Sequence, residues 1–127
     1  MSSEVVPSSV TGGPPGRELP RGPELLPGPR VCAIADALSL VGDRWSLLVV
    51  RELGFGVHRF TDIQRHTGAS REILTARLRK LENERVLARR RYRDRPPRDE
   101  YVLTEAGEAL LPVLVALRVW GEVHVGR

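Results

Sequence analysis

The sequence contains very little of what several common classes of protein require. It has one cysteine, Cys32, so it cannot form an intramolecular disulfide or supply a zinc site built from several cysteines. No apolar run approaches the ~18 residues that a membrane helix needs, and the N-terminus lacks the charged and apolar regions of a signal peptide. We therefore expect a protein that stays in the cytoplasm and has no membrane partner.

Residues that support catalysis or cofactor binding are also scarce. The histidines His58, His66 and His124 are scattered along the chain without the spacing of a metal site. The Gly-Phe-Gly sequence at residues 54–56 is not followed by the lysine of a phosphate-binding loop. We expect no enzyme activity, no cofactor and no metal.

Proline and glycine are concentrated at the N-terminus. Residues 1–30 hold seven of the ten prolines and five of the twelve glycines, and they show no periodic apolar pattern. A segment of this composition cannot bury enough apolar surface to fold by itself. The sequence predicts a disordered arm over residues 1–30 and one folded domain over residues 31–127.

Positive charge is concentrated in one segment of the folded region. The net charge is +4, but residues 70–98 hold eleven Arg or Lys against four Asp or Glu, while the rest of the chain sums to −3. Such a segment is typical of a surface that binds a polyanion, although many charged runs are simply solvated.

The apolar pattern predicts a mainly helical first half. Apolar residues at helical spacing indicate a helix from near Val31 to Gly42 and a second from Asp43 to Gly54. Residues 57–60 are expected to form a very short strand. Thr61 opens a small helix that ends at Gly68.

A longer helix and a hairpin follow. Ser70 is expected to cap a helix that runs to about Arg85. Its predicted buried residues are Ile73, Leu74, Leu78 and Leu81.

Residues 87–93 and 99–103 have strand character, and the two prolines of residues 94–97 exclude a central strand there, so these residues form a turn or an extended tip. Thr104 caps a final helix that reaches the C-terminus and is kinked at Pro112.

Two short helices joined by a glycine-containing turn at residues 67–69 indicate a helix-turn-helix, and the hairpin after it would make the motif winged. The fold class we predict is mainly α with a small β-hairpin, a winged helix-turn-helix with additional N- and C-terminal helices. The candidate DNA-binding residues are Ser70, Arg71, Glu72, Thr75, Ala76, Arg77, Arg79 and Lys80 in the second helix and Arg93, Arg95 and Arg98 in the hairpin. Arg77 lies on a flank and suits a phosphate better than a base. At least one of the arginines at positions 89–91 is expected to be a structural ion-pair partner.

Several sequence blocks resemble the HxlR family of regulators. The blocks are Cys32–Ala35, Leu40–Leu48, Arg51–Leu53, Arg59–Ile63, Leu74–Glu82, Tyr101–Gly107, Leu111–Leu114 and Trp120–Gly121. The resemblance implies a dimeric winged-helix protein that binds double-stranded operator DNA near the genes it controls. We expect a transcriptional regulator, favouring a repressor, that binds an inverted repeat as a homodimer.

The final helix supports a dimer independently, because it is apolar on more than one side and needs a second surface to cover it. The alternative is a helix wrapped by its own small domain. The candidate interface residues are Ala37, Leu38, Leu110, Leu114, Leu117 and Trp120.

Cys32 has two interpretations. In some members of the resembled family a cysteine before the first helix senses oxidants or electrophiles, although Ala33 stands here where proline commonly follows it. The other interpretation is a small buried apolar residue. A redox or small-molecule effector is therefore left open.

Two alternatives to DNA binding also remain. A winged helix that binds protein usually lacks the basic wing and the polar helix face that this sequence keeps. RNA binding is disfavoured because aromatic residues make up only 5% of the chain, which leaves few rings for stacking on single strands.

Overall fold

The computed structural model describes residues 33–126, which divide into two parts, residues 33–111 and residues 112–126. Each part is described by itself. The arm predicted over residues 1–30 and the thiol of Cys32 lie outside the described residues. Among residues 33–126, no helix is both long enough and apolar enough to cross a membrane.

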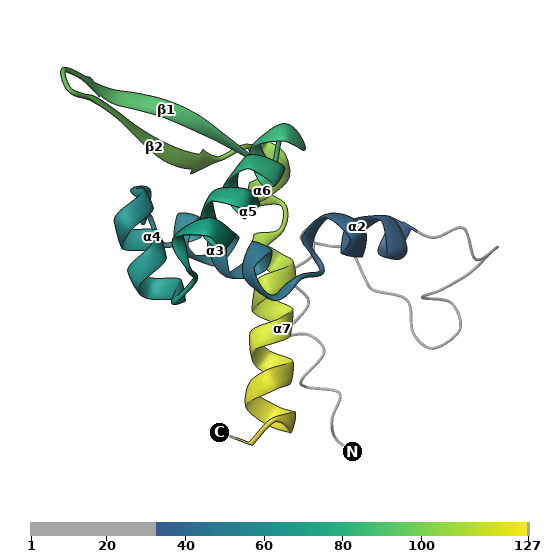
Figure 1. The fold of residues 1–127 in the computed structure, drawn as a ribbon. Coiled ribbons are helices and arrows are strands. Elements are labelled where there is room, and N and C mark those ends of the chain that lie inside the picture. The colour runs from purple at the N-terminus through teal and green to yellow at the C-terminus, as the bar shows by residue number, and fades with distance from the viewer. Residues whose placement is uncertain (1–32, 127) are drawn as a thin grey trace. The chain divides into compact units, whose positions relative to one another are not determined.

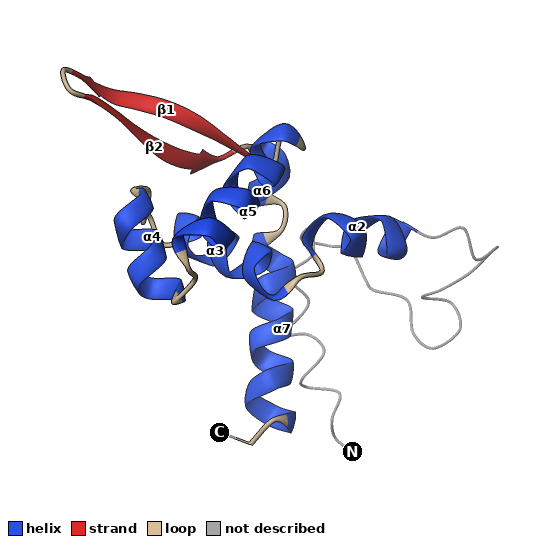
Figure 2. Cartoon of the chain, viewed as in Figure 1, coloured by secondary structure: helices blue, strands red, loops and turns tan. Residues whose placement is uncertain are grey.

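The hairpin follows a first group of helices, as predicted, and precedes two further helices (Figure 1). The elements are α2 (Ala33–Val41), α3 (Arg44–Gly54), α4 (Phe60–Thr67), α5 (Arg71–Asn83), β1 (Leu87–Asp94), β2 (Pro97–Leu103), α6 (Glu105–Glu108) and α7 (Leu111–His124). Within the described residues, β1 and β2 form the one sheet, a two-stranded hairpin (Figure 2). The predicted class, mainly helical with a small hairpin, is confirmed.

Side chains at the predicted positions cap the two longer helices of the first part. The Asp43 carboxylate accepts hydrogen bonds from the backbone N–H groups of Trp45 (3.0 Å) and Ser46 (3.1 Å) at the start of α3. The Ser70 hydroxyl accepts one from Ile73 N (3.1 Å) at the start of α5. These contacts satisfy backbone donors that have no partner inside a helix, so they determine where each helix begins.

The core lies where α3 packs against α4, α5 and β2. Each large aliphatic side chain buried there stabilises the fold by about 1.5–3 kcal/mol. The fully buried residues with the largest side chains are Ile63, Leu74, Leu81, Leu87, Val49 and Val50.

The hairpin is antiparallel and extends beyond the helices α3, α4 and α5 (Figure 1). Its register runs from the pair Leu87–Leu103 at the base to the pair Asp94–Pro97 near the tip. Pro97 is the first residue of β2, a position where a strand tolerates a residue with no N–H donor. The register shifts between Arg91 and Arg93, which marks a bulge in β1.

The short strand predicted at residues 57–60 is wrong. Residues 57–59 have no regular structure and α4 already begins at Phe60. One residue of this segment, His58, does meet β2, since Tyr101 N donates to His58 O at 2.8 Å. A single pairing of this kind is too short to make a strand.

The single kinked helix predicted from Thr104 is also wrong. Thr104 does cap a helix, because its hydroxyl accepts a hydrogen bond from Gly107 N (3.2 Å), but this helix, α6, ends at Glu108. Helix α7 then starts at Leu111, which places Pro112 in its first turn. Proline has no N–H to donate and is tolerated there, whereas a continuous helix would need that donor.

Two details of α5 also differ from the prediction. The helix ends at Asn83 because Arg85 has φ 63°, a left-handed conformation that cannot continue a right-handed helix. Ile73 is only half-buried, whereas Leu74, Leu78 and Leu81 are buried as expected.

Candidate nucleic-acid interface

The turn between α4 and α5 is built by its own side chains. Gly68 ends α4 with φ 78°, a conformation that side chains rarely adopt, and Ala69 is buried beneath the turn. The Thr67 hydroxyl donates to Ile63 O (2.8 Å) and accepts from Ala69 N (3.3 Å). The two helices and this turn form a helix-turn-helix, and they hold α5 in one orientation.

Helix α5 presents a polar face to solvent opposite its buried leucines. The predicted contact residues that are exposed on it are Ser70, Arg71, Glu72, Thr75, Ala76 and Arg79. Arg71 lies in the first turn, with its guanidinium carbon 5.3 Å from the centre of the Phe60 ring. Thr75 and Ala76 are small, so the backbone of α5 can approach a flat surface closely.

The two remaining predicted residues of α5, Arg77 and Lys80, make contacts inside the protein. Arg77 Nε donates to Asp43 Oδ2 at 2.8 Å, and both side chains are partly buried. Lys80 Nζ donates to Ser39 O at 2.9 Å, near the end of α2. These contacts tie α5 to α2 and to the start of α3, and a role of either residue on DNA stays a prediction.

The Asp43 carboxylate accepts hydrogen bonds from both α3 and α5. Partial burial of its carboxyl raises its pKa, but the hydrogen bonds from the Ser46 hydroxyl (2.6 Å), from Arg77 and from the two backbone N–H groups outweigh that effect. The pKa of Asp43 is lowered from 3.8 to about 2. The carboxylate is therefore charged at neutral pH and holds Arg77 in place.

The arginines at the base of the hairpin form ion pairs. Arg89 contacts Glu82 of α5 (3.2 Å) and Asp99 of β2 (3.8 Å), and the pair with Glu82 raises the pKa of Arg89 further. Arg90 pairs with Glu100 at 2.6 Å. Arg91 also pairs with Asp99, at 3.4 Å. Where the sequence predicts at least one structural partner at positions 89–91, all three positions are paired.

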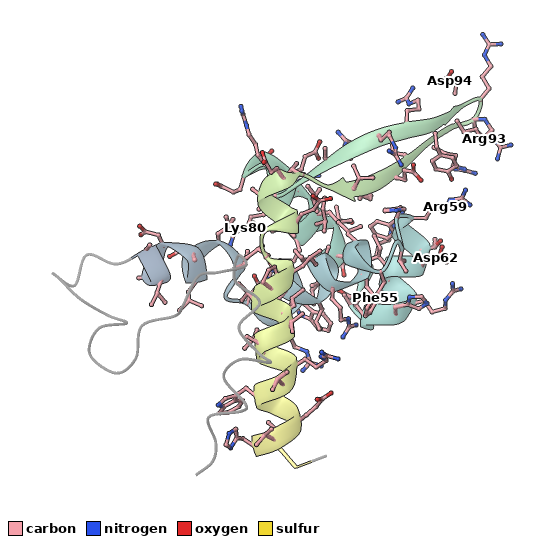
Figure 3. All side chains as sticks on the ribbon, turned by 180° about the vertical axis from the view of Figure 1, so that it is seen from behind. Phe55, Arg59, Asp62, Lys80, Arg93 and Asp94 are labelled. Atoms are coloured by element: carbon pink, nitrogen blue, oxygen red, sulfur yellow. The ribbon has the colours of Figure 1, made fainter. Side chains whose placement is uncertain are left out.

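The arginines near the hairpin tip differ from those at the base. Arg93, Arg95 and Arg98 are exposed, and no ion pair among residues 33–126 includes any of them. Figure 3 shows Arg93 pointing outward near the tip, close to Asp94. Their charge is therefore available to a ligand outside the protein.

A groove of about 440 Å³ separates α5 from the hairpin. Its lining includes Thr75 and Arg79 from the exposed face of α5 and the ring of Tyr101 from β2. Burial raises the pKa of Tyr101, while the charge of Arg89 lowers it, so the phenol stays neutral near pH 7. The exposed face of α5 and the hairpin therefore line one continuous polar surface.

Two of the histidines, His58 and His66, make contacts inside the protein. His66 Nδ1 lies 3.0 Å from the buried carboxylate of Glu52, and His58 Nδ1 lies 2.8 Å from Tyr101 O. Within residues 33–126, no three His, Cys, Asp or Glu side chains are grouped closely enough to hold a metal ion.

The predicted dimer residues lie on α2, on α7 and just before α7. Ala37 and Leu38 of α2 are exposed, and so are Leu117 and Trp120 of α7. Leu110 and Leu114 are partly exposed, and no residue of α7 is buried. Their role in an interface stays a prediction.

Sequence reasoning missed the contacts that link α4 to its neighbours. Arg59 lies over the ring of Tyr92, and Arg71 lies over the ring of Phe60. Neither pair follows from periodicity, because each joins residues of different elements. The signal that was present is the adjacency of Arg59 and Phe60 just before a helix, which places a cation and a ring at the start of α4.

A helix-turn-helix with an exposed polar second helix, followed by a basic hairpin, defines a winged helix-turn-helix fold, which is common among DNA-binding proteins. The chain matches the family model described as HxlR-like helix-turn-helix over residues 40–127. It belongs to that family.

Proteins with similar sequences are named as helix-turn-helix regulators. The chain is 43% identical over 95 residues to the uncharacterized HTH-type transcriptional regulators Rv3095 of Mycobacterium tuberculosis and Mb3122 of Mycobacterium bovis, which covers 75% of this chain and 60% of each relative. It therefore spans about three fifths of the length of these relatives. It is 33% identical over 97 residues to the uncharacterized HTH-type regulator YdeP of Bacillus subtilis, which covers 76% of both chains.

Solved structures show the same fold. PA1607, described as a candidate transcription factor, has a TM-score of 0.71 and 39% identity over 77% of this chain and 68% of its own. The redox regulator HypR in its oxidized form has a TM-score of 0.63 and 30% identity over 73% of this chain and 97% of its own. A MarR-family regulator of Porphyromonas gingivalis W83, with a TM-score of 0.66 and 23% identity over 77% and 97%, supports the fold alone. The chain thus has the winged helix-turn-helix fold of the HxlR-like family.

Proposed function

We propose that the protein is a repressor that binds an inverted-repeat operator in double-stranded DNA as a homodimer. Helix α5 lies in the major groove, and the wing, defined as residues 89–98, contacts the backbone or the minor groove. The observation that carries this proposal is the combination of an exposed polar face on α5 with a following hairpin whose tip carries three arginines that no ion pair includes within the described part of the chain.

The face of α5 suits base recognition. Its N-terminal turn carries Arg71, a residue type that binds guanine through two hydrogen bonds, and Thr75 and Ala76 leave room for the helix to approach the base edges. Arg79 is exposed one turn further on. These residues are the candidates for sequence selection.

The wing suits the backbone. Arg93, Arg95 and Arg98 surround a tight tip, so they can reach consecutive phosphates or enter a narrow minor groove. The paired arginines at the base, Arg89 to Arg91, keep the two strands together and tied to α5.

The homodimer rests on the exposed apolar residues of α2 and α7. Trp120 is 60% exposed and Leu38 is 59% exposed, which is costly for single chains in water. A two-fold dimer would cover such residues and would place two copies of α5 about 10 bp, or a multiple of that spacing, apart. A dimer on its operator excludes other proteins from the same DNA, so repression is the simplest consequence.

An effector is also part of the proposal. Cys32 precedes α2, and the similar protein HypR is described as a redox regulator, which supports an oxidation switch at Cys32. With no second cysteine, the switch requires a disulfide between subunits or a mixed disulfide with a small thiol. Mass spectrometry and DNA binding after mild oxidation test it, and an unchanged mass with unchanged affinity would end the idea.

The decisive experiment is selection of bound sequences from random double-stranded DNA, followed by binding measurements at low ionic strength. We expect an enriched inverted repeat, a complex of two chains per operator and an affinity that falls steeply with salt. Absence of binding to any double-stranded DNA at low salt, where electrostatic attraction is greatest, contradicts the proposal. A protein-binding winged helix would behave in that way.

A further inference from the structure

One contact joins the middle of the wing to the helix-turn-helix. The guanidinium carbon of Arg59 lies 4.4 Å from the centre of the Tyr92 ring. Arg59 is the N-cap residue of α4, and its side chain makes no capping hydrogen bond. Figure 3 shows Arg59 at the end of α4 that faces the hairpin. The Arg59 side chain thus contacts the wing.

The backbone of β1 is irregular at the same residue. The strand register passes from the pair Arg91–Asp99 directly to the pair Arg93–Arg98, so Tyr92 has no partner on β2. A bulge of this kind leaves one extra residue on one strand and redirects its side chain. The irregularity therefore coincides with the residue that carries the ring.

The contact lies further along the hairpin than its other attachments. At the base, Arg89 pairs with Glu82 of α5, and His58 shares hydrogen bonds with the backbone of Tyr101. Beyond Tyr92, no hydrogen bond, ion pair or ring contact among residues 33–126 joins residues 93–98 to a helix. Tyr92 is thus the outermost point at which the hairpin is held.

We propose that Arg59 is a positioning residue, whose contact with the bulged Tyr92 sets the angle of the wing so that the tip arginines reach the DNA read by α5. We call this pair the wing clasp. The inference rests on the proposed function, because it assumes that α5 and the wing bind one DNA duplex together.

The physical basis is the flexibility of an isolated ribbon. A two-stranded hairpin without further support is only marginally stable, so its outer half can bend in several directions. If the clasp is removed, only a fraction of molecules hold the wing in the binding orientation, and the apparent affinity falls by that fraction. A cation–π contact at an exposed site is weak, so the expected loss is about two- to fivefold.

The test compares four variants for binding to the selected operator: Tyr92→Phe, Tyr92→Leu, Arg59→Gln and the double variant Arg59→Gln/Tyr92→Leu. Tyr92→Phe keeps the ring and should bind like the wild type. Tyr92→Leu should bind about two- to fivefold more weakly. The double variant should bind no more weakly than Arg59→Gln alone, because both changes remove the same contact.

A second comparison separates positioning from simple stabilisation. Removing the tip charge with Arg95→Ala should weaken binding less in the Tyr92→Leu background than in the wild type, because a misplaced wing no longer benefits from Arg95. Equal melting temperatures for the variants show that the fold is intact. The clasp is disproved if Tyr92→Leu binds like the wild type. It is equally disproved if the losses of affinity in Arg59→Gln and Tyr92→Leu add in the double variant, since Arg59 would then contact DNA on its own.

A measurement without DNA distinguishes failure of the clasp from failure of the proposed function. In NMR spectra of the free protein, the ring of Tyr92 should shift the Arg59 side-chain protons upfield in the wild type and in Tyr92→Phe. The shift should be lost in Tyr92→Leu, with faster amide exchange in residues 98–100. If these shifts appear and the protein binds no DNA, the proposed function fails and the clasp stands. If the shifts are absent, the clasp fails whatever the protein binds.

Discussion

Asp43 connects α3 and α5 through one carboxylate. It caps α3, accepts a hydrogen bond from the buried Ser46 hydroxyl and pairs with Arg77 of α5. Each bond favours the charged form over the neutral one, which is why the pKa of Asp43 falls to about 2 although burial opposes ionisation. The Asp43 side chain is therefore one of the contacts that fix the position of α5 and of its exposed face.

We expect Asp43→Asn to destabilise the protein at pH 7 by about 2 kcal/mol, with a difference that shrinks in acid. The folded pKa of about 2 is below the ordinary 3.8, so the carboxylate stabilises the fold above pH 3.8 and loses that effect as the pH falls toward 2. Urea unfolding of both proteins at several pH values checks this. Asparagine retains much of the cap, so a constant difference between the two proteins at all pH values would contradict the charge argument.

Arg71 is the residue whose substitution tests sequence recognition most directly. We expect Arg71→Ala to lose about 1–3 kcal/mol of discrimination at one base pair and to relax the sequence preference there. Repeating the DNA selection with the variant measures this. Arg118→Ala, which removes one exposed arginine of α7, controls for the loss of charge. Recovery of an unchanged motif with Arg71→Ala would remove Arg71 from the contact set.

At the scale of elements, the wing has two electrostatic regions. Its base is neutralised by Glu82, Asp99 and Glu100, whereas no ion pair in the described part of the chain includes an arginine of the tip. The base is therefore built for stability and the tip for contact with an anion.

Arg95→Ala should weaken DNA binding about equally for all sequences. It should also reduce the slope of log affinity against log salt concentration by about 1, the contribution of one phosphate contact. Measuring the affinity at several salt concentrations gives that slope. Arg90→Ala is the matched control, because Arg90 lies on the same hairpin but pairs with Glu100 at 2.6 Å. If both variants change the slope equally, the distinction between base and tip fails.

Helix α6 packs against the base of the hairpin so closely that it needs a glycine. A Cβ at Gly107 would overlap the Val86 carbonyl oxygen, which is backbone and cannot move aside easily. The same oxygen accepts hydrogen bonds from Thr104 N (3.1 Å) and from the Thr104 hydroxyl (2.9 Å), which fix it in place.

We expect Gly107→Ala to lower the free energy of unfolding by about 1–3 kcal/mol, because the overlap must be relieved by moving backbone. Chemical denaturation measures this. Glu108→Ala, at an exposed position of the same helix, should change stability by less than about 0.5 kcal/mol. Equal stability of Gly107→Ala and the wild type would show that α6 can move away from Val86.

At the scale of the whole molecule, the apolar content of α7 is the feature that needs an explanation. The helix has no buried residue, although its sequence is dominated by valine and leucine and includes the exposed Trp120. A helix of this composition is stable in water when another surface covers it.

We expect the wild type to be a dimer and Leu117→Glu to be a monomer, because a charge in a covered apolar surface is strongly unfavourable. Leu117 is 50% exposed in the single chain, so the change should leave the fold of the monomer intact. Light scattering after size exclusion gives the mass, and a DNA of two half-sites compared with one half-site gives the functional effect. A wild type that is monomeric at micromolar concentration and equally tight on one half-site would overturn the dimer.

The local structure follows from short-range signals that the sequence carries by itself. Asp43 and Ser70 mark the starts of α3 and α5 because their side chains bond to backbone groups two or three residues away. The burial of Leu74, Leu78 and Leu81 follows from helical spacing, and the turn of the hairpin follows from two consecutive prolines. The family resemblance rests on the same local blocks.

Tertiary structure decided the features that depend on residues far apart in the chain. The pairing of Arg77 with Asp43, the division of the wing arginines into paired and unpaired sets and the meeting of Arg59 with the bulged Tyr92 all require elements to be packed first. The close approach of Gly107 in α6 to the backbone of Val86 likewise joins residues far apart in the chain. Local propensity cannot specify such contacts, because the partner of each side chain is determined by packing and lies outside the local sequence.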